Sequence, residues 1–215
     1  MKRIANYFMA ASFAVMIIAS CGKDNTGAAD DGDTTKINGH EYVDLGLSVK
    51  WATCNVGADS PEEYGDYFAL GETEPKNEYT AENSVTYNKK QPDISGNPEY
   101  DAARANWGGT WRLPTESEVR ELVDGCDWEW TVQGGRNGYK VTGPNGNSIF
   151  FPASGYMDGT LLNDAEEIGY YWTSSPNERE TYAEMYTCRL LFYNDYVNVG
   201  WSDRYLGFSV RAVSE

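Results

Sequence analysis

The sequence predicts an α+β domain that is rich in strands and contains one or two short helices. Aromatic residues make up 14% of the chain and glycine occurs 22 times, a composition typical of short strands joined by tight turns. Apolar and polar residues alternate in the C-terminal third, whereas helical periodicity is confined to short stretches. The 215 residues suffice for one domain with its own core.

The N-terminus predicts a targeting segment. Lys2 and Arg3 precede an apolar stretch that ends at Ile18, and small residues then lead to Cys21. The stretch is shorter than the roughly 20 apolar residues of a membrane-spanning helix. This order of charge, apolar run and small residues is typical of a cleaved signal peptide, which we assign to residues 1–20. The alternative is an ordinary secretory signal with a chance cysteine.

The residues around the cysteine predict an anchor. The run from Ile18 to Gly22 (Ile-Ala-Ser-Cys-Gly) resembles the lipobox of bacterial lipoproteins, which implies lipidation of Cys21. Each buried methylene contributes about 0.8 kcal/mol, so two or three acyl chains hold a protein to a membrane durably. The acidic residues 30–33 resemble the surface-export signal of Bacteroidota lipoproteins. These resemblances imply an outer-membrane lipoprotein that faces the cell exterior.

The segment after the cysteine predicts a flexible acidic tether over residues 21–38, followed by the domain over residues 39–215. The formal net charge is −16 at pH 7, and loss of the basic leader makes it more negative. So much negative charge disfavours nucleic acid and anionic lipid head groups as partners. It favours solubility at an outer surface.

The first half of the domain predicts short strands and long loops. Residues 41–47, 49–54 and 67–71 predict strands. Residues 72–98 are polar and interrupted by prolines, which indicates a surface loop. Residues 100–107 predict a short helix that ends at a Gly-Gly pair.

The strongest local signal is a capping box. Thr115 and Glu118 match the S/T-x-x-E pattern, in which each side chain bonds the free backbone N–H of the other residue. Apolar residues follow at helical spacing from Val119, and Gly125 predicts the stop. The predicted helix covers residues 116–124.

The C-terminal part predicts antiparallel strands. An Asn-Gly step at residues 145–146 predicts a hairpin between residues 139–142 and 149–151. The Gly-Gly pair at residues 134–135 reads as a second hairpin loop. Further strands are predicted at residues 169–174, 183–193, 196–201 and 208–213, with residues 194–195 as the turn between the second and third of these.

Three cysteines remain once Cys21 is acylated, which allows one disulfide and one leftover thiol. Outside the inner membrane a disulfide persists. We favour a pair between Cys54, which ends a predicted strand, and Cys126, which lies at a helix exit. Sequence alone does not fix connectivity, so other pairings stay open. Cys188 lies in an alternating strand and predicts a small buried side chain.

Several separated motifs match a known family. The runs Trp-Gly-Gly-Thr-Trp-Arg-Leu-Pro-Thr (107–115), Tyr-Trp-Thr-Ser-Ser (171–175) and Gly-Phe-Ser-Val-Arg (207–211) resemble the Fibrobacter succinogenes major paralogous domain family. Residues 40–52 resemble its opening segment, so the resemblance extends over residues 38–214. It implies a C-type-lectin-like fold whose last strands display a ligand-facing surface, and it implies no established reaction.

The motif residues predict a structural role first. We expect the aromatic and apolar members to pack two sides of a core. Arg112 and Arg211 are cations inside apolar motifs, so they need carboxylate or carbonyl partners, and Glu118 or a nearby carbonyl is the expected partner for one of them. The residues of this structural motif are Trp111, Arg112, Leu113, Pro114, Thr115, Glu118, Trp172, Phe208 and Arg211.

Residue types needed for catalysis or metal binding are scarce. His40 is the only histidine, and no nucleophile motif surrounds it. Zinc sites draw on several His and Cys side chains. The prediction is therefore no enzyme, no metal and no cofactor. A glycosidase pair is not excluded by counting, but the carboxylates considered are scattered: Asp101, Glu116, Glu118, Glu166, Glu167 and Glu184.

Calcium is a minor alternative. Residues 175–178 (Ser-Pro-Asn-Glu) and 201–203 (Trp-Ser-Asp) faintly resemble the Glu-Pro-Asn and Trp-Asn-Asp elements of C-type lectins. The first has Ser in place of a carboxylate, and the second has Ser in place of Asn. Calcium needs six to eight oxygen ligands.

The C-terminal strands predict the ligand surface. Tyr and Trp contribute large contact area with few rotors, and Asn and Ser add adaptable hydrogen bonds. The alternative is an ordinary aromatic outer face. In similar domains this region can be diversified. The candidate ligand-binding residues are Tyr193, Asn194, Asp195, Tyr196, Asn198, Trp201, Ser202, Asp203, Arg204 and Tyr205.

The predicted function is a non-enzymatic module that binds a glycan or a protein at the cell surface. The alternatives are a carbohydrate-active enzyme or its accessory, and a structural subunit of a surface or fimbrial assembly. A cleft with two carboxylates about 5–10 Å apart favours hydrolysis. An aromatic face around Tyr196 and Trp201 favours binding, and a long exposed strand edge favours assembly.

Overall fold

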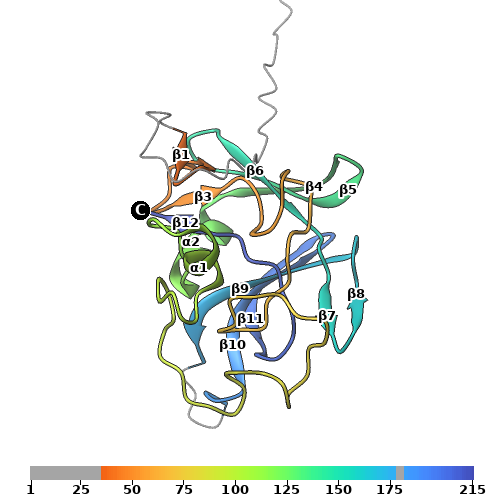
Figure 1. Ribbon diagram of the computed structural model, residues 1–215. Coiled ribbons are helices and arrows are strands. Elements are labelled where there is room, and N and C mark those ends of the chain that lie inside the picture. Colours follow the sequence, from red (N-terminus) through yellow and green to blue (C-terminus); the bar gives the residue numbers. More distant parts are fainter. Residues whose placement is uncertain (1–34, 178–181) are drawn as a thin grey trace, which may run out of the picture.

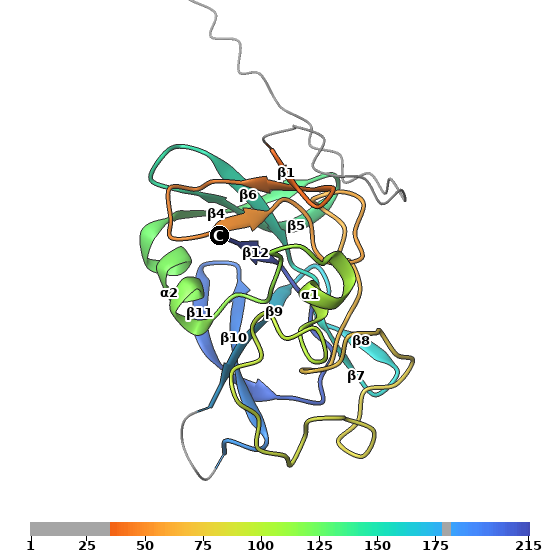
Figure 2. The same cartoon turned by 60° about the vertical axis from the view of Figure 1, so that its left-hand side comes forward.

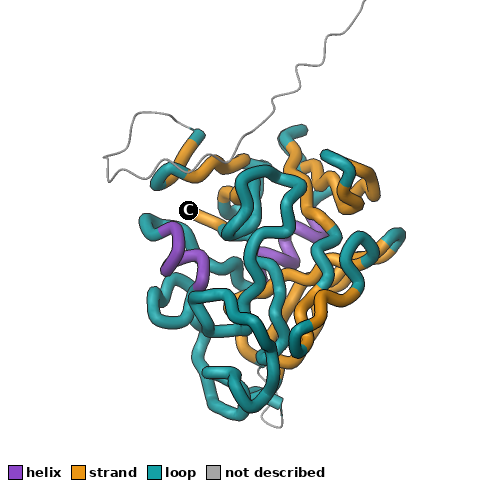
Figure 3. Tube along the Cα trace, turned by 45° about the vertical axis from the view of Figure 1, so that its right-hand side comes forward, coloured by secondary structure: helices purple, strands orange, loops and turns teal. Residues whose placement is uncertain are grey.

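The computed structural model describes residues 35–177 and 182–215. Within these residues two helices and twelve strands form several small antiparallel sheets, joined by long loops (Figures 1 and 3). The β-rich α+β class is therefore confirmed. The predicted signal peptide, the predicted lipidation site at Cys21 and most of the predicted tether lie outside the described residues.

The two ends of the domain meet in one sheet. Strands β1 (Lys36–Ile37), β2 (His40–Val43), β3 (Lys50–Ala52) and β12 (Val213–Ser214) lie side by side in that order, all antiparallel (Figure 1). Strand β1 falls inside the segment predicted as a tether. Folded structure therefore begins before residue 39, because the backbone of β1 has a partner in β2.

Residues 67–71 and 208–213 do not form the continuous strands that were predicted. Phe68 and Phe208 make one isolated bridge. Beyond it, the carbonyls of Val210 and Ala212 accept from Val56 and Ala52, at 2.9 Å each. The C-terminal segment thus changes its partner every two residues, which is why only β12 is a regular strand.

Helix α1 (Ala102–Trp107) starts at a buried carboxylate. Asp101 accepts hydrogen bonds from the backbone of Arg104 at 3.1 Å, Gly96 at 2.7 Å and Leu113 at 2.8 Å. Burial raises the pKa of Asp101, although these backbone bonds act in the opposite direction. Asp101 therefore joins the helix start to two loops, and is unsuited to act as a catalytic base.

Helix α2 (Glu116–Gly125) has the predicted capping box. Thr115 accepts from the backbone of Glu118, and the carboxylate of Glu118 accepts from the backbone of Thr115 at 2.8 Å. Gly125 is the last helical residue rather than the stop, and Cys126 takes the C-cap position in an extended conformation.

Two three-stranded sheets carry the C-terminal half. One contains β4 (Asp127–Gln133), β5 (Arg136–Thr142) and β6 (Ser148–Pro152), with the two predicted glycine turns. The other has the order β11-β10-β9, and α2 packs against it (Figure 2). Its strands are β9 (Ile168–Pro176), β10 (Tyr186–Tyr193) and β11 (Tyr196–Asp203). The predicted hairpin loop at residues 134–135 implied a strand before it, which is β4, but no bounds were predicted for that strand. The small hairpin of β7 (Tyr156–Asp158) and β8 (Leu161–Asn163) was not predicted.

The core consists of two aromatic clusters. The first, which we call the sheet cluster, surrounds Phe151 and Phe192 and includes the buried residues of α2. The second surrounds Trp111, Trp172 and Phe208, and the rings of Trp172 and Phe208 stack with their centres 4.1 Å apart. The motif rings were predicted to pack two sides of a core, with the capped helix beside Trp111. The three rings share the second cluster, whereas the buried residues of α2 belong to the sheet cluster.

Candidate ligand-binding site

The motif arginines have structural partners. Arg112 makes a two-pronged ion pair with Glu118, at 2.6 and 2.9 Å. Burial alone would raise the pKa of Glu118, but the bonds from Arg112 and from the Thr115 backbone outweigh it, and the pKa is lowered. The expected partner of Arg112 is therefore confirmed, and the pair fixes the start of α2.

Arg211 is buried without a carboxylate partner among the described residues. Its guanidinium donates to Asn55 Oδ1 at 2.9 Å and to three backbone carbonyls, and it lies 4.6 Å from the ring centre of Phe151. Burial lowers its pKa to about 10. Arg211 ties β3, β6 and the C-terminal segment together.

Arg204 is not a ligand-binding residue. Its side chain is fully buried, and it donates to Thr187 Oγ1 at 3.0 Å, to the Lys89 carbonyl at 2.9 Å and to the Ala183 carbonyl at 2.6 Å. Burial lowers the pKa of Arg204 to about 10. The prediction was wrong because the loop around residue 89 folds over this end of β11, which sequence spacing does not reveal.

The predicted disulfide between Cys54 and Cys126 is not formed. Cys126 and Cys188 are free thiols. Cys54 is disulfide-bonded, but its partner is neither of these two. Cys126 lies at the end of α2 beside the sheet cluster, whereas Cys54 is buried beyond β3, and their sequence positions carry no information on this separation. Burial raises the pKa of the Cys126 thiol to about 11 and of the Cys188 thiol to about 12.

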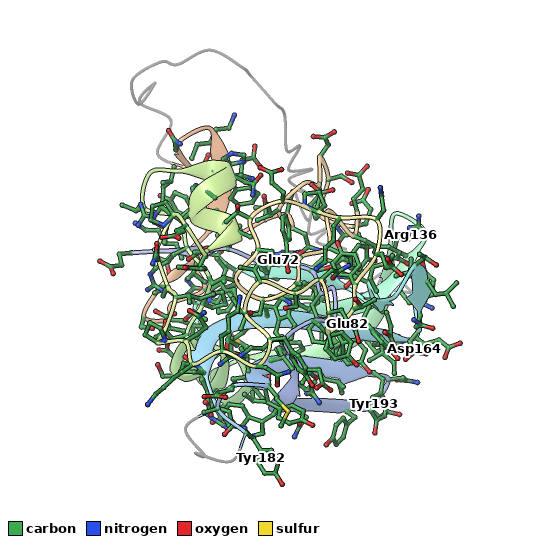
Figure 4. The ribbon with its side chains drawn as sticks, turned by 60° about the horizontal axis from the view of Figure 1, so that its bottom comes forward. Glu72, Glu82, Arg136, Asp164, Tyr182 and Tyr193 are labelled. Carbon is green, nitrogen blue, oxygen red and sulfur yellow. The ribbon has the colours of Figure 1, made fainter. Side chains whose placement is uncertain are left out.

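The β10–β11 hairpin brings four predicted residues together. Tyr193 pairs with Tyr196 across the two-residue turn of Asn194 and Asp195, where Asp195 has a φ of 64°. The rings of Tyr193 and Tyr196 stack at 4.7 Å, and each side chain is more than two-fifths exposed. Figure 4 shows Tyr193 at the rim of the molecule, pointing outward. The Tyr139 hydroxyl donates to the Tyr193 carbonyl at 3.3 Å and anchors the hairpin.

An open groove of about 470 Å³ lies beside this hairpin. Its aromatic lining residues include the half-buried Trp130, which packs edge-on against Tyr139 at 5.2 Å. The turn before β9 adds two carboxylates to the lining. The predicted ligand-binding set lacked four of the lining residues, which come from β4, from this turn and from the first position of β9. The lining residues are Trp130, Glu166, Glu167, Ile168, Tyr193 and Asn194.

The two carboxylates of the groove differ. Glu166 accepts from the Tyr64 hydroxyl, from Arg136 at 2.9 Å and from the Asn137 backbone at 2.7 Å. Burial alone would raise the pKa of Glu166, but these bonds lower it overall. It is therefore held ionised and cannot act as a general acid. Glu167 is exposed and free to accept hydrogen bonds from a ligand.

The remaining predicted residues divide between the two faces of the sheet. Side chains alternate along a strand, so Tyr196, Asn198 and Ser202 share one face, which we call the open face. Trp201 lies on the opposite face together with Val199, which packs against the sheet cluster. Tyr196 and Trp201 therefore do not form a shared aromatic face, which was the arrangement that would have favoured binding.

Asp203 and Tyr205 lie at the far end of β11, ~23 Å from the hairpin at 3.3 Å per residue. Tyr87 donates to Asp203 at 3.3 Å and packs edge-on against Tyr205 at 5.2 Å. Burial raises the pKa of Asp203. Asp203 and Tyr205 therefore contact the long loop that contains Tyr87, and they are not part of the hairpin surface.

The other candidate centres remain single residues. His40 stacks on Trp107 at 4.0 Å, at the start of the domain. Within residues 35–177 and 182–215, no group of three or more His, Cys, Asp and Glu side chains is placed to hold a metal ion. No helix in the same part of the chain is long and apolar enough to cross a membrane.

The groove and the adjoining open face together form the candidate ligand surface. Comparison of the chain with family models, with curated proteins and with solved structures finds no match.

Proposed function

We propose that the chain is a lipid-anchored, surface-exposed module that binds a ligand without transforming it. On this proposal its fold is C-type-lectin-like, and the ligand lies along the groove and the β10–β11 hairpin. The supporting observation is the groove itself, in which the exposed ring of Tyr193 adjoins an exposed amide and an exposed carboxylate. Rigid aromatic faces beside adaptable polar groups suit a glycan or a protein loop.

The groove gives little support to the enzyme alternative. Hydrolysis of a glycosidic bond needs one carboxyl group that can donate a proton and a second that stays ionised. Glu166 is held ionised by Arg136, and Asp101 is buried among backbone amides. Binding needs no such pair, so the same residues suit recognition better than catalysis.

The free edge of β11 favours assembly as a second candidate function. On the opposite edge of the sheet, Trp172 and Ser174 in β9 donate to the carbonyls of Ser209 and Pro114. Within the described residues, no other segment bonds to the outer edge of β11 between Val197 and Trp201. That stretch contains no Lys or Pro, which commonly protect edge strands. Light scattering compares the mature chain with an Asn198→Lys variant, whose changed side chain lies on the open face of the same stretch. This candidate requires an oligomer that the variant loses.

Binding is tested with two matched tyrosines. Tyr193→Ala removes a ring from the groove, and Tyr182→Ala removes an equally exposed ring at the other end of β10. The mature chain is screened against glycans and host-surface proteins, with and without a calcium chelator. The proposal requires that Tyr193→Ala weakens binding of a detected ligand and that Tyr182→Ala does not. Equal binding by all three proteins contradicts it.

The anchor is tested separately. Cys21→Ser is expected to release the chain from membranes, and surface protease is expected to reach the wild-type chain on intact cells. The sulfur atom of Cys21 can carry a lipid or form a disulfide bond, but it cannot do both. Mass spectrometry of the N-terminal peptide distinguishes them: a diacylglyceryl mass supports the anchor, whereas a disulfide link to the Cys54 peptide contradicts it.

A further inference from the structure

The open face of the β10–β11 ribbon contains a cation without a counter-charge. Arg189 lies directly opposite Gly200 in the register of the two strands. A Cβ atom at Gly200 would lie 2.8 Å from Asn198 Oδ1 and 3.4 Å from Arg189 Nη1. The missing side chain therefore gives the guanidinium and the amide room to lie flat across β11, above the bare backbone.

The hydrogen bonds of Arg189 engage the side-chain oxygens of two neighbours and leave several N–H and O–H donors available to a ligand. Its Nε donates to Ser202 Oγ at 3.2 Å, and its Nη1 lies 3.4 Å from Asn198 Oδ1, at the long limit of a hydrogen bond. With these oxygens engaged, the groups still available are the other guanidinium N–H groups, the amide N–H₂ of Asn198 and the hydroxyl hydrogen of Ser202. We call Arg189, Asn198 and Ser202 the donor set.

Other arginines of the domain are satisfied differently. Arg112, Arg120 and Arg136 pair with glutamates at 2.6 to 2.9 Å. The buried Arg204 and Arg211 donate to backbone carbonyls. Arg189 has neither a carboxylate nor a carbonyl partner among the described residues, and burial lowers its pKa. A half-buried guanidinium of this kind gains from an anionic ligand, because burial has removed part of its hydration.

The surroundings indicate which anion fits. The Arg189 guanidinium lies 5.9 Å from the ring centre of Tyr170, and the exposed ring of Tyr196 lies two residues before Asn198 on the same face. A planar carboxylate matches the fork of a guanidinium, and aromatic rings offer apolar faces to a sugar. We propose that the donor set binds the carboxylate of an acidic sugar, whose neighbouring rings extend over Tyr196 toward the groove. This rests on the proposed function and specifies its ligand class.

The overall charge of −16 repels an approaching anion. Direct contacts with the donor set, rather than long-range electrostatic attraction, must therefore supply the affinity. At physiological salt the Debye length is about 8 Å, which screens most distant carboxylates while leaving a direct ion pair effective. A sulfated or phosphorylated sugar offers similar acceptors, but a flat two-pronged site favours the planar carboxylate.

The test uses sialyllactose and a glucuronic acid oligosaccharide, each beside its carboxyl methyl ester, and an acidic peptide. Titration calorimetry compares the mature chain with Arg189→Gln, Gly200→Ala and the charge-matched control Arg120→Gln on α2. We expect at least one acid to bind more tightly than its ester. Arg189→Gln should weaken the binding of that acid about ten- to a hundredfold, the usual range for a lost charged hydrogen bond, and leave the binding of the ester unchanged.

Gly200→Ala should reduce acid binding without changing any charge, because the new Cβ displaces Asn198 and the guanidinium. Arg120→Gln should bind like the wild type, and equal melting temperatures establish that the variants are folded. The inference is overturned if neither acid binds, if acid and ester bind equally, or if Arg189→Gln binds the acid as tightly as the wild type does. A preference for the acidic peptide over both sugars overturns it as well. If the ester or another neutral glycan binds, and only Tyr193→Ala loses that binding, the proposed function is upheld and this inference fails.

Discussion

The two ends of the β10–β11 ribbon place similar polar and aromatic residues in opposite settings. At the far end, Arg204 is 0% exposed and donates to three oxygens from three segments. At the hairpin end, Tyr193 and Tyr196 are 43% and 42% exposed and lie beside an open groove. The long loop around residue 89 covers only the far end. The comparison teaches that coverage by distant loops, rather than residue type, separates structural from binding positions on this ribbon.

The largest expected effect is at the closed end. Arg204→Met leaves the carbonyls of Lys89 and Ala183 and the hydroxyl of Thr187 without their donor. Each unsatisfied buried group costs about 1–3 kcal/mol, so we expect a loss of about 3 kcal/mol or more in the free energy of unfolding. Urea denaturation measures it, with Arg189→Met on the open face as the control. An equal loss in both variants would break the comparison.

An intermediate effect is expected at Arg112. Arg112→Ala removes the partner of Glu118, whose side chain is only 13% exposed. Breaking a largely buried pair typically costs about 3–5 kcal/mol, and partial exposure lowers our expectation to about 2 kcal/mol. For a domain of this size, that shifts the melting temperature by about 4–8 °C. Unchanged melting together with lost ligand binding would instead assign Arg112 to the binding surface.

The same pair predicts a pH dependence. The pKa of Glu118 is lower in the folded protein than its ordinary value, so the unfolded chain binds its proton more readily. The stabilisation is therefore complete above the unfolded pKa of about 4.3 and is lost as pH falls through the lower folded pKa. Glu118→Gln should be less stable than the wild type at pH 7, and the difference should shrink below about pH 4. A difference that stays constant across this range would contradict the assigned ion pair.

The smallest effect on stability is expected at the open end. Tyr196→Ala removes an exposed ring whose partner is the equally exposed Tyr193. Exposed substitutions typically change the free energy of unfolding by about 0.5 kcal/mol or less. Its thermal melting should therefore match that of the wild type, while binding of any ligand held by the groove should weaken. A loss comparable to that of Arg204→Met would show that the hairpin rings are structural.

The local elements of this fold were predictable. The capping box of Thr115 and Glu118 and the glycine hairpins depend on residues within a few positions of one another. The turn at Asn194 and Asp195 was also predicted, and it sets the register of the whole ribbon. That register could have revealed two features from sequence alone, because pairing across a two-residue turn places Arg189 opposite Gly200 and puts Tyr196 and Trp201 on opposite faces.

The rest depended on contacts between distant segments. Nothing near Arg204 in the sequence indicates that the carbonyls of Lys89 and Ala183 surround it. Trp130 joins the groove because β4 packs beside the hairpin, and Cys126 is a free thiol that packs against the sheet cluster. The sequence by itself determined the strand-rich class, the capped helix and the hairpin that carries the candidate site, because short-range hydrogen bonds and side-chain alternation decide these. Only the tertiary structure decided which polar residues are buried and which face a ligand, because burial depends on loops that arrive from far along the chain.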